Sequence, residues 1–290
     1  MSSTKFDLIV LGSGPGGYVA AIRASQLGLK TAIVEAAELG GICLNWGCIP
    51  TKALLKSAQV FEYINHAADY GITVKGAETD FTGMIKRSRS VADGMSKGVT
   101  FLMKKNKIEV IAGWGKIQPG KKIEVADKDG KKTVYAADNI IIATGTRARE
   151  LPSMKMDDKK IIGYRKAMTL EKQPKTMVIV GSGAIGVEFA YFYNSIGTKV
   201  TIVEYMDRIV PVEDVEVSKA LEKIYKKAGM TIMTSSEVTA VDTKGTGSKV
   251  TVKTAKGEET LECDVVLSAA GVVSNLENIG LEDVGILVEK

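Results

Sequence analysis

A strand, a glycine-rich turn, a helix and a second strand that ends in an acid occur twice in this 290-residue chain, and the duplication limits its fold more than any other feature. The first copy spans 6–35 and the second spans 177–204. Such a pattern is typical of a dinucleotide-binding unit, in which glycines let the backbone approach a pyrophosphate and the acid binds ribose hydroxyls. A lone glycine pattern would be a weak signal, but here all four parts occur in order in each copy.

The two copies also keep one register. Every glycine of the pattern, and the acid that closes it, has its counterpart 169 residues later, and chance would not preserve that spacing. We therefore expect two cofactor sites on an α/β fold of two tandem Rossmann-like domains. Their candidate cofactor-binding residues are Gly12, Gly14, Gly17 and Glu35 in the first copy, and Gly181, Gly183, Gly186 and Glu204 in the second.

Each copy continues into short alternating strands and then into a buried apolar strand. In the first copy these are 122–125 and 133–135, followed by 139–145; in the second they are 249–254, followed by 264–271. Alternation of this kind predicts a small antiparallel meander beside each parallel sheet. The first copy has 43 extra residues between its acid and its apolar strand, so it carries an insert that the second lacks.

Cys43 and Cys48 lie in this insert, and their setting suits reversible disulfide chemistry. A continuous helix would place residues five apart about 7.5 Å from each other along its axis, whereas disulfides need Cα atoms roughly 4.4–6.8 Å apart. We therefore expect the backbone to turn at Gly47 and a helix to begin at Pro50. The helix N-terminus and the ammonium of Lys52 would both favour a reactive thiolate at Cys48.

The cysteine pair could instead be a structural disulfide or part of a zinc site, but the sequence favours neither. Three cysteines in 290 residues and no signal peptide are typical of a reducing compartment, where structural disulfides are rare, so we expect a cytoplasmic protein. A zinc site would need two more ligands, and the remaining candidates are His66 and Cys263, which form no second close pair. We expect no metal.

The charge and hydropathy of the chain argue against binding to nucleic acid and against a membrane span. The net charge of +5 comes from lysine pairs scattered along the chain without interleaved aromatic residues, so nucleic-acid binding is not expected. No apolar run is long enough to span a membrane. A chain of this length and apolar content is expected to form two domains.

With two dinucleotide sites and one redox pair, the chain resembles the flavin-dependent pyridine nucleotide–disulfide oxidoreductases along its whole length. The segments 40–41, 43–45, 47–50 and 52–54 look like the branch of that family that acts on lipoamide. The resemblance implies FAD and NAD as cofactors, and oxidation of dihydrolipoyl groups with reduction of NAD through the dithiol. The alternatives are another disulfide or mercuric reductase of the family, or a non-catalytic dinucleotide-binding fragment.

The resemblance also implies roles for single residues. Cys43 would be the thiol that exchanges with lipoamide, and Cys48 the thiol next to the flavin. Lys52 would approach the flavin and pair with Glu188, which would also meet the nicotinamide; without the family, Glu188 is interpreted as an ordinary helix-surface carboxylate. Further implied contacts with FAD are Gly115, Thr144, Gly145 and Thr146, and implied contacts with NAD are Val238 and Gly271.

Glu204 predicts the choice of nicotinamide cofactor. A carboxylate at this position accepts hydrogen bonds from ribose hydroxyls but repels the 2′-phosphate of NADP, so we expect NAD. Arg208, four residues later, could soften that repulsion, although a solvated surface charge is the preferred interpretation.

The resemblance completes the expected organisation. Residues 1–149 would form the FAD-binding domain with the dithiol, 150–272 the NAD-binding domain, and 273–290 the start of a return to the first domain. The rest of that domain and a dimerisation domain with a catalytic histidine are not among the 290 residues, so we expect a truncated form of a homodimeric enzyme, with weakened FAD retention and turnover. The implied partner is a lipoyl-bearing acyltransferase or a glycine-cleavage carrier protein.

Overall fold

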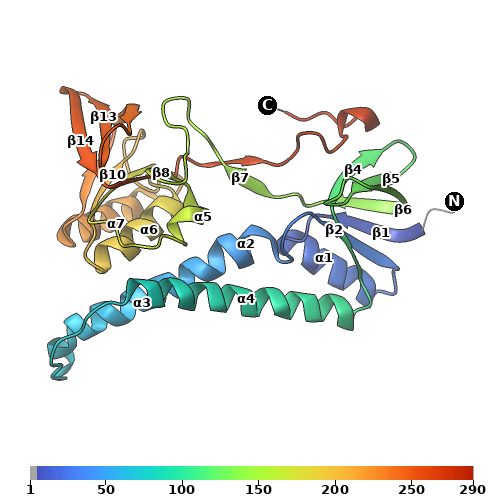
Figure 1. The fold of residues 1–290 in the computed structure, drawn as a ribbon, viewed down its shortest axis with the longest axis horizontal. Helices are drawn as coiled ribbons and strands as arrows, with labels where there is room; N and C mark the ends of the chain where they lie inside the picture. Colours follow the sequence, from blue (N-terminus) through green and yellow to red (C-terminus); the bar gives the residue numbers. More distant parts are fainter. Residues whose placement is uncertain (1–4, 290) are drawn as a thin grey trace. The chain divides into compact units, whose positions relative to one another are not determined.

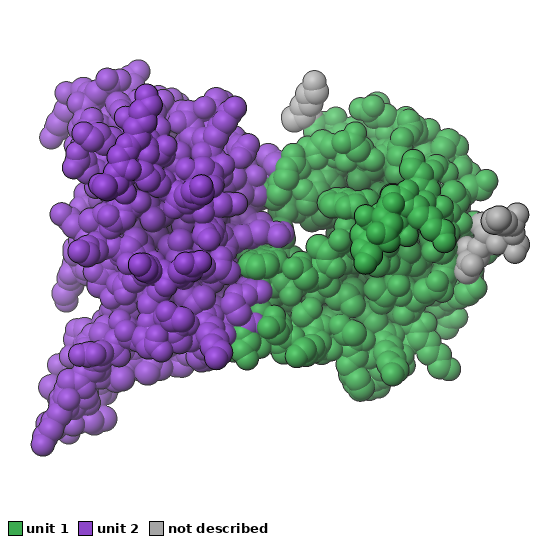
Figure 2. All heavy atoms as spheres, viewed as in Figure 1, with its two compact units in different colours: residues 1–49, 90–147, 274–290 green, residues 50–89, 148–273 purple. Residues whose placement is uncertain are grey.

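The computed structural model describes residues 5–289, and the contacts between them divide the chain into two compact units (Figure 2). Unit 1 contains the residues up to 49, 90–147 and those from 274; unit 2 contains 50–89 and 148–273. The domain ranges expected from the sequence stay a prediction. The division by contacts differs from them chiefly at 50–89, a helical segment that belongs to unit 2.

Unit 1 is built on one six-stranded sheet in the order β3-β2-β1-β6-β5-β4 (Figure 1). The strands β3, β2, β1 and β6 are parallel, whereas β6, β5 and β4 pair antiparallel, and α1 packs against β1 and β2. The expected parallel sheet with an antiparallel meander is confirmed. The elements are β1 (Lys5–Leu11), α1 (Pro15–Gln26), β2 (Thr31–Glu35), α2 (Gly41–Trp46), β3 (Glu109–Ala112), β4 (Trp114–Gln118), β5 (Lys122–Ala126), β6 (Lys132–Ile142) and a 3₁₀ turn, η2 (Glu282–Val284).

Two expectations about the strand β6 were wrong, its division into two strands and the burial of its end. The sequence predicts separate strands at 133–135 and 139–145, but 133–142 lies within one strand that pairs with β5 in its first half and with β1 in its second. Its end is also less buried than expected, since Ile141 and Ile142 are 38% and 37% exposed. Among the described residues, the stretch 139–142 has β1 as its only strand neighbour, and this leaves one edge uncovered.

Unit 2 repeats the plan with two differences, an additional edge strand in its parallel sheet and a meander that forms a sheet of its own. Its parallel sheet has the order β11-β10-β9-β15-β8, with α6 packed against β9 and β10, but its meander β12-β13-β14 is a separate antiparallel sheet. The elements are β8 (Ile161–Ile162), α5 (Tyr164–Ala167), β9 (Thr176–Val180), α6 (Ala184–Ser195), β10 (Lys199–Val203), α7 (Val215–Lys227), β11 (Thr231–Met233), β12 (Glu237–Asp242), β13 (Ser248–Thr254), β14 (Gly257–Cys263) and β15 (Val265–Ser268).

Apolar packing joins the two sheets of unit 2. Val178 and Val266 of the parallel sheet share one buried cluster with Val250 and Val252 of the meander, and each of the four side chains is at most 2% exposed. Burial of a valine side chain stabilises a fold by about 1.5–3 kcal/mol, so this cluster fixes the meander against β9 and β15. In unit 1 a buried cluster likewise joins Ile117 and Ile123 of the meander to Leu11 of β1, and β6 in addition belongs to both parts of the sheet.

The insert of the first copy forms two long helices, α3 (Cys48–Asn65) and α4 (Phe81–Lys105). Helix α3 begins at Cys48 rather than at the expected Pro50. Within unit 2, Arg87 of α4 donates to the backbone oxygen of Ala53 in α3 at 2.7 Å. Among residues 5–289 no helix is both long and apolar enough to cross a membrane. The remaining elements are η1 (Ala67–Tyr70), β7 (Thr146–Ala148) and β16 (Val272–Ser274), the last two paired with each other.

Candidate functional site

Two glycine turns of the same geometry lie at the carboxyl ends of β1 and β9. In each unit the last glycine of the pattern packs so closely on the first that a Cβ would overlap a carbonyl oxygen: Gly17 on Gly12, and Gly186 on Gly181. No residue with a side chain fits there, which explains the glycines physically. The usual place for a nucleotide in such folds is the carboxyl edge of the parallel sheet, at the point where the strand order reverses.

The middle glycines leave room for a ligand. Gly14 caps α1 and Gly183 caps α6, and the space that a Cβ would occupy at each is open to at least 4 Å. An open space at a helix N-terminus suits a pyrophosphate, because unpaired backbone N–H groups and the helix dipole favour an anion there. Both turns therefore fit the phosphate part of a dinucleotide.

The two acids are held by serines that the sequence pattern did not single out. Ser13 donates to Glu35 through both its backbone N–H, at 2.9 Å, and its hydroxyl. Ser182 does the same to Glu204, at 2.7 Å and 2.6 Å. The two serines lie 169 residues apart, so the spacing that matched the glycines and acids would also have found them.

Glu204 is more enclosed than its counterpart. Its side chain is 7% exposed, whereas Glu35 is partly exposed, and the backbone N–H of Met206 donates to its second carboxylate oxygen at 2.8 Å. Arg208 is directed to other acceptors: its guanidinium donates to Asp207 at 3.1 Å and to the carbonyl of Pro211 at 3.0 Å. Arg208 is thus bound locally rather than being a freely solvated charge.

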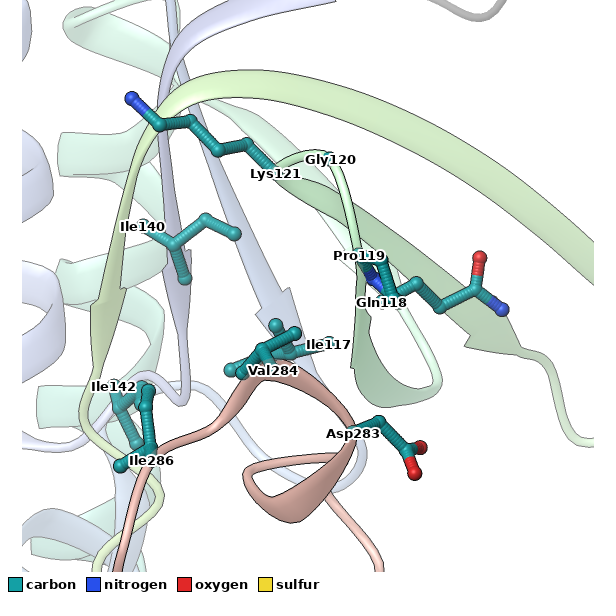
Figure 3. Close-up of a pocket in the computed structure, with 10 residues that line it drawn as sticks. All are labelled: Ile117, Gln118, Pro119, Gly120, Lys121, Ile140, Ile142, Asp283, Val284 and Ile286. Carbon is teal, nitrogen blue, oxygen red and sulfur yellow. The ribbon is translucent and has the colours of Figure 1, made fainter.

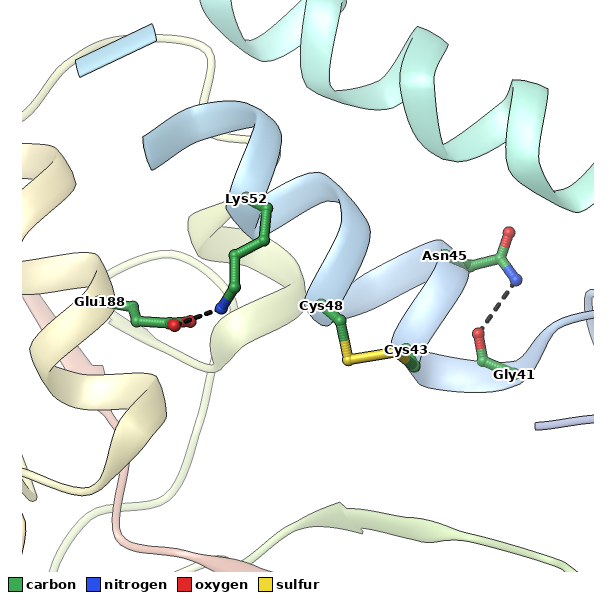
Figure 4. The surroundings of a disulfide bond; sticks show 6 residues. All are labelled: Gly41, Cys43, Asn45, Cys48, Lys52 and Glu188. Carbon is green, nitrogen blue, oxygen red and sulfur yellow. Dashed lines mark hydrogen bonds and ion pairs between the residues drawn. A yellow bond between two sulfur atoms is a disulfide. The ribbon is translucent and has the colours of Figure 1, made fainter. Parts of the chain in front are cut away.

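Cys43 and Cys48 form a disulfide with their Cα atoms 4.6 Å apart, as expected (Figure 4). The helical conformation is interrupted at Gly47, between α2 and α3. Cys43 therefore lies on the short helix α2, and Cys48 is the first residue of α3. Cys263 is separate from this pair, free and buried. Burial raises the pKa of its thiol to about 11, so Cys263 is a poor nucleophile near neutral pH.

Two glycines seat the dithiol helix on the first fingerprint turn. The backbone N–H of Gly40 donates to the carbonyl of Ser13 at 3.1 Å, and a Cβ at Gly41 would lie 2.6 Å from the Cα of Gly14. Both glycines have left-handed φ angles, +96° and +60°, which other residues adopt only with strain. Buried Asn45 then donates to the carbonyl of Gly41 at 3.0 Å and steadies the first turn of α2.

Lys52 and Glu188 form an ion pair within unit 2 (Figure 4). Lys52 lies one turn after Cys48 on α3, and Glu188 lies on α6 after the second fingerprint. The side chain of Lys52 is 59% exposed and that of Glu188 30%. An exposed pair of this kind contributes little to stability.

The other FAD contacts implied by the resemblance lie at two different places in unit 1. Thr144 adjoins Gly12 at the end of β6, and its carbonyl accepts from the side chain of Asn275 at 3.0 Å. Gly145 accepts from the backbone of Asn275 at 2.9 Å, and Thr146 opens β7. Gly115, in contrast, lies in β4, where the side chain of Leu11 fills the space of a Cβ; the structure gives it a packing reason.

The implied NAD contacts also divide. Gly271 follows β15, and its carbonyl accepts from the backbone of Arg149 at 3.0 Å. Val238 is 7% exposed and belongs to the apolar cluster of the meander, with its carbonyl accepting from Ser153 at 3.1 Å. The side chain of Val238 is therefore part of the core of unit 2. Among the described residues, no group of three His, Cys, Asp or Glu side chains could hold a metal ion.

One pocket of unit 1 includes none of the predicted site residues. It is an apolar hollow between the β4–β5 turn, β6 and the segment around η2 (Figure 3). Its apolar lining consists mainly of Ile117, Ile140, Ile142, Val284 and Ile286. The hollow lies beside the uncovered edge of β6, so we regard it as a consequence of that edge and not as the dinucleotide site.

Comparisons with known proteins agree with this geometry. The family model described as pyridine nucleotide-disulphide oxidoreductase matches residues 6–290. A protein of Rhizobium etli named dihydrolipoyl dehydrogenase is 48% identical over 99% of this chain and 63% of its own length. The protein of the same name from Chlorobaculum tepidum is 45% identical over 99% of this chain and 62% of its own length.

A solved structure shows the same fold. The crystal structure of LpdA from Mycobacterium tuberculosis has a TM-score of 0.90 and 28% sequence identity, and the match covers 99% of this chain and 62% of that one. The chain thus spans somewhat less than two thirds of the length of the relatives that it matches.

Proposed function

The chain belongs to the pyridine nucleotide-disulphide oxidoreductase family, and on that premise we propose that it takes part in the oxidation of dihydrolipoyl groups, with NAD as the final electron acceptor. The observation that carries the proposal is the disulfide Cys43–Cys48 at a helix N-terminus, seated through Gly40 and Gly41 on a dinucleotide turn. Relatives at 45–48% identity named dihydrolipoyl dehydrogenase support the choice of substrate class.

The cysteine pair accepts electrons from the substrate by thiol–disulfide exchange. A thiolate of the dihydrolipoyl group attacks the sulfur of Cys43, the Cys43–Cys48 bond breaks, and Cys48 leaves as a thiolate. The second lipoyl thiol then attacks the lipoyl sulfur of the mixed disulfide, which closes the lipoyl ring and releases Cys43 as a thiol. The substrate loses two electrons, and the protein dithiol gains them. The N-terminus of α3 stabilises the Cys48 thiolate, which makes Cys48 the better leaving group.

The two fingerprint turns fit two dinucleotides. We assign FAD to the turn of unit 1, because the dithiol helix is seated there, and NAD to the turn of unit 2, because an ionised Glu204 repels the 2′-phosphate of NADP. Bound FAD supplies the chemistry that connects a two-electron dithiol with a nicotinamide. Lys52, held by Glu188, adds a positive charge one turn after Cys48.

The proposal extends to partners and place of action. A substrate of this class is carried on a lipoyl-bearing acyltransferase or a glycine-cleavage carrier protein, and the proposed enzyme acts as a homodimer. The proposed compartment is the cytoplasm. Structural disulfides are rare there because the thiol pool is reducing, and the disulfides that do occur are usually catalytic.

The role of Cys43 can be tested without any cofactor. In the Cys48→Ser variant, the remaining thiolate of Cys43 should attack oxidised lipoamide, open its ring and form a mixed disulfide that alkylation of the released lipoyl thiol traps for mass spectrometry. The matched variant Cys43→Ser should form far less adduct through Cys48. Equal labelling of both variants would contradict the assignment of Cys43 as the exchanging thiol.

The whole reaction is tested with dihydrolipoamide, NAD and added FAD, by following NADH absorbance. We expect NADH from the chain joined to the C-terminal remainder of a relative, less from the unaltered chain, and none from the Cys43→Ser variant of either polypeptide. Cys263→Ser is the control and should leave the rate unchanged. Binding of both nucleotides without any NADH in either polypeptide would favour a non-catalytic dinucleotide-binding protein instead.

A further inference from the structure

The buried serine of the second fingerprint is the feature that the proposed function does not use. Ser182 is fully buried, and its hydroxyl points at the carboxylate of Glu204 with a donor–acceptor distance of 2.6 Å. The backbone of Glu204 is fixed on both sides, since its N–H donates to Met233 and its carbonyl accepts from Ser236, at 2.8 Å and 2.9 Å. Only the side chain of Glu204 retains rotational freedom, and that is what Ser182 restrains.

Three donors hold this carboxylate, and only one of them can be removed by substitution. The backbone N–H groups of Ser182 and Met206 donate to its two oxygens at 2.7 Å and 2.8 Å, and the hydroxyl of Ser182 is the third donor. A buried carboxylate stays charged only if hydrogen bonds replace its lost water. Bonds to a charged acceptor are about twice as strong as neutral ones, so the hydroxyl contributes substantially to the direction in which the Glu204 carboxylate points.

From this geometry we infer that Ser182 is a positioning residue that sets the preference of unit 2 for NAD over NADP. The inference rests on the proposed binding of NAD at this turn. By fixing the carboxylate, Ser182 leaves the remaining lone pairs of Glu204 for a ribose 2′-hydroxyl, and it keeps the negative charge where a 2′-phosphate would lie. Without the hydroxyl, the carboxylate can rotate or relax away from a phosphate, so discrimination falls more than binding itself.

Unit 1 supplies a matched control. Ser13 makes the same pair of bonds to Glu35, but its hydroxyl also accepts from the backbone N–H of Gly40 at 3.2 Å, so it takes part in seating the dithiol helix. Replacing Ser13 should therefore disturb unit 1 and leave the nucleotide choice of unit 2 as it was.

The test measures dissociation constants for NAD and for NADP by titration calorimetry on the unaltered chain, Ser182→Ala and Ser13→Ala, with thermal unfolding of each to show that it is folded. We expect Ser182→Ala to lower the ratio of the NADP constant to the NAD constant about tenfold, the scale of one hydrogen bond to a charged group. Ser13→Ala should change the ratio by less than about twofold, the spread expected for changes at independent sites.

A double-mutant comparison shows whether Ser182 acts through Glu204. In a Glu204→Gln background, Ser182→Ala should leave the ratio unchanged, because no carboxylate remains to be positioned. If Ser182→Ala weakens NAD and NADP by the same factor, or changes the ratio equally in both backgrounds, the inference is overturned while the proposed use of NAD stands. If the unaltered chain binds NADP as tightly as NAD, both the inference and the proposed cofactor choice fail.

Discussion

The two fingerprint turns share one geometry, and they differ in the segment that comes after the acid. In unit 1, Gly40 donates to the carbonyl of Ser13, and the chain enters the dithiol helix α2 at once. In unit 2, Val210 donates to the carbonyl of Ser182, at 3.0 Å, in a loop that leads to α7. The same hydrogen bond to the serine carbonyl thus closes both turns, but only the first turn carries sulfur chemistry.

The residues that make this bond explain the difference. In unit 1 the left-handed backbone falls on two glycines, which allow α2 to pack against Gly14 without a side chain in between. In unit 2 it falls on Val210, a β-branched residue at φ +40°, a conformation that is rare and strained for such side chains. Val210 is buried, and the burial of its apolar side chain compensates for the backbone strain. Gly40 and Gly41 thus permit the close contact between the dithiol helix and the first turn.

The largest expected effect concerns the sulfurs, which should behave oppositely in the two units. In the oxidised folded chain we expect almost no reaction with a thiol reagent, because Cys43 and Cys48 are bonded and Cys263 is buried. Mild reduction should release two fast thiols, and Cys43→Ser should show one fast thiol before any reduction. Thiol titration checks this; a fast third thiol in the folded protein would contradict the assignment of Cys263 as inert.

The second effect tests whether the two turns are equally tight. Gly17→Ala and Gly186→Ala each place a methyl group against a backbone carbonyl, and we expect each to lower the free energy of unfolding by about 3 kcal/mol, the upper range for overpacking. Gly16→Ala is the control, since the space at Gly16 is open. It should be neutral or slightly stabilising, because alanine favours a helix. Urea unfolding measures all three, and a tolerated Gly186→Ala would show that the second turn is looser.

The third effect sharpens the contrast between the acids. Glu204→Ala should weaken NAD binding by roughly 1–3 kcal/mol, the scale of lost hydrogen bonds to a charged group, and should reduce the rejection of NADP. Glu35→Ala should leave the nicotinamide choice unchanged, because Glu35 belongs to the other turn. Calorimetric titration of both nucleotides against both variants decides the matter, and a shift of preference in Glu35→Ala would mean that the cofactor assignments are reversed.

The smallest effect is a pH dependence confined to unit 2. Burial raises the pKa of Cys263 to about 11, above its value of about 8.5 in an unfolded chain. Between these two values the unfolded chain releases a proton that the folded chain keeps, so stability falls as pH rises through that window and is fully present below it. Unfolding at about pH 7.5 and about pH 9.2, compared with Cys263→Ser, should show a loss of about 1 kcal/mol in the unaltered chain alone. Parallel curves for the two proteins would rule this contribution out.

Most of the fold was predictable because its signals are local. The two βαβ units can be identified from periodic apolar residues, from glycines at turns and from the constant spacing of 169 residues between the copies. The disulfide was predictable for the same reason, since Gly47 and Pro50 reveal a break between two cysteines that lie five residues apart. The features that could not be predicted involve side-chain direction: nothing local showed that Gly115 and Val238 face apolar clusters, or that Ile141 and Ile142 lie at an uncovered edge.

By itself, then, the sequence determined the two dinucleotide folds, their register and the redox pair, since each depends on backbone conformation and spacing along the chain. Only the tertiary structure decided which hydrogen bonds the side chains make: the hydroxyl of each fingerprint serine bonds its acid, whereas the pairing of Lys52 with Glu188, 136 residues away, was implied by the family resemblance and not by spacing. Such contacts depend on rotamers and on how distant elements pack. Spacing in a sequence does not encode these, and a hydrogen bond forms only when the packed fold brings donor and acceptor within about 3 Å.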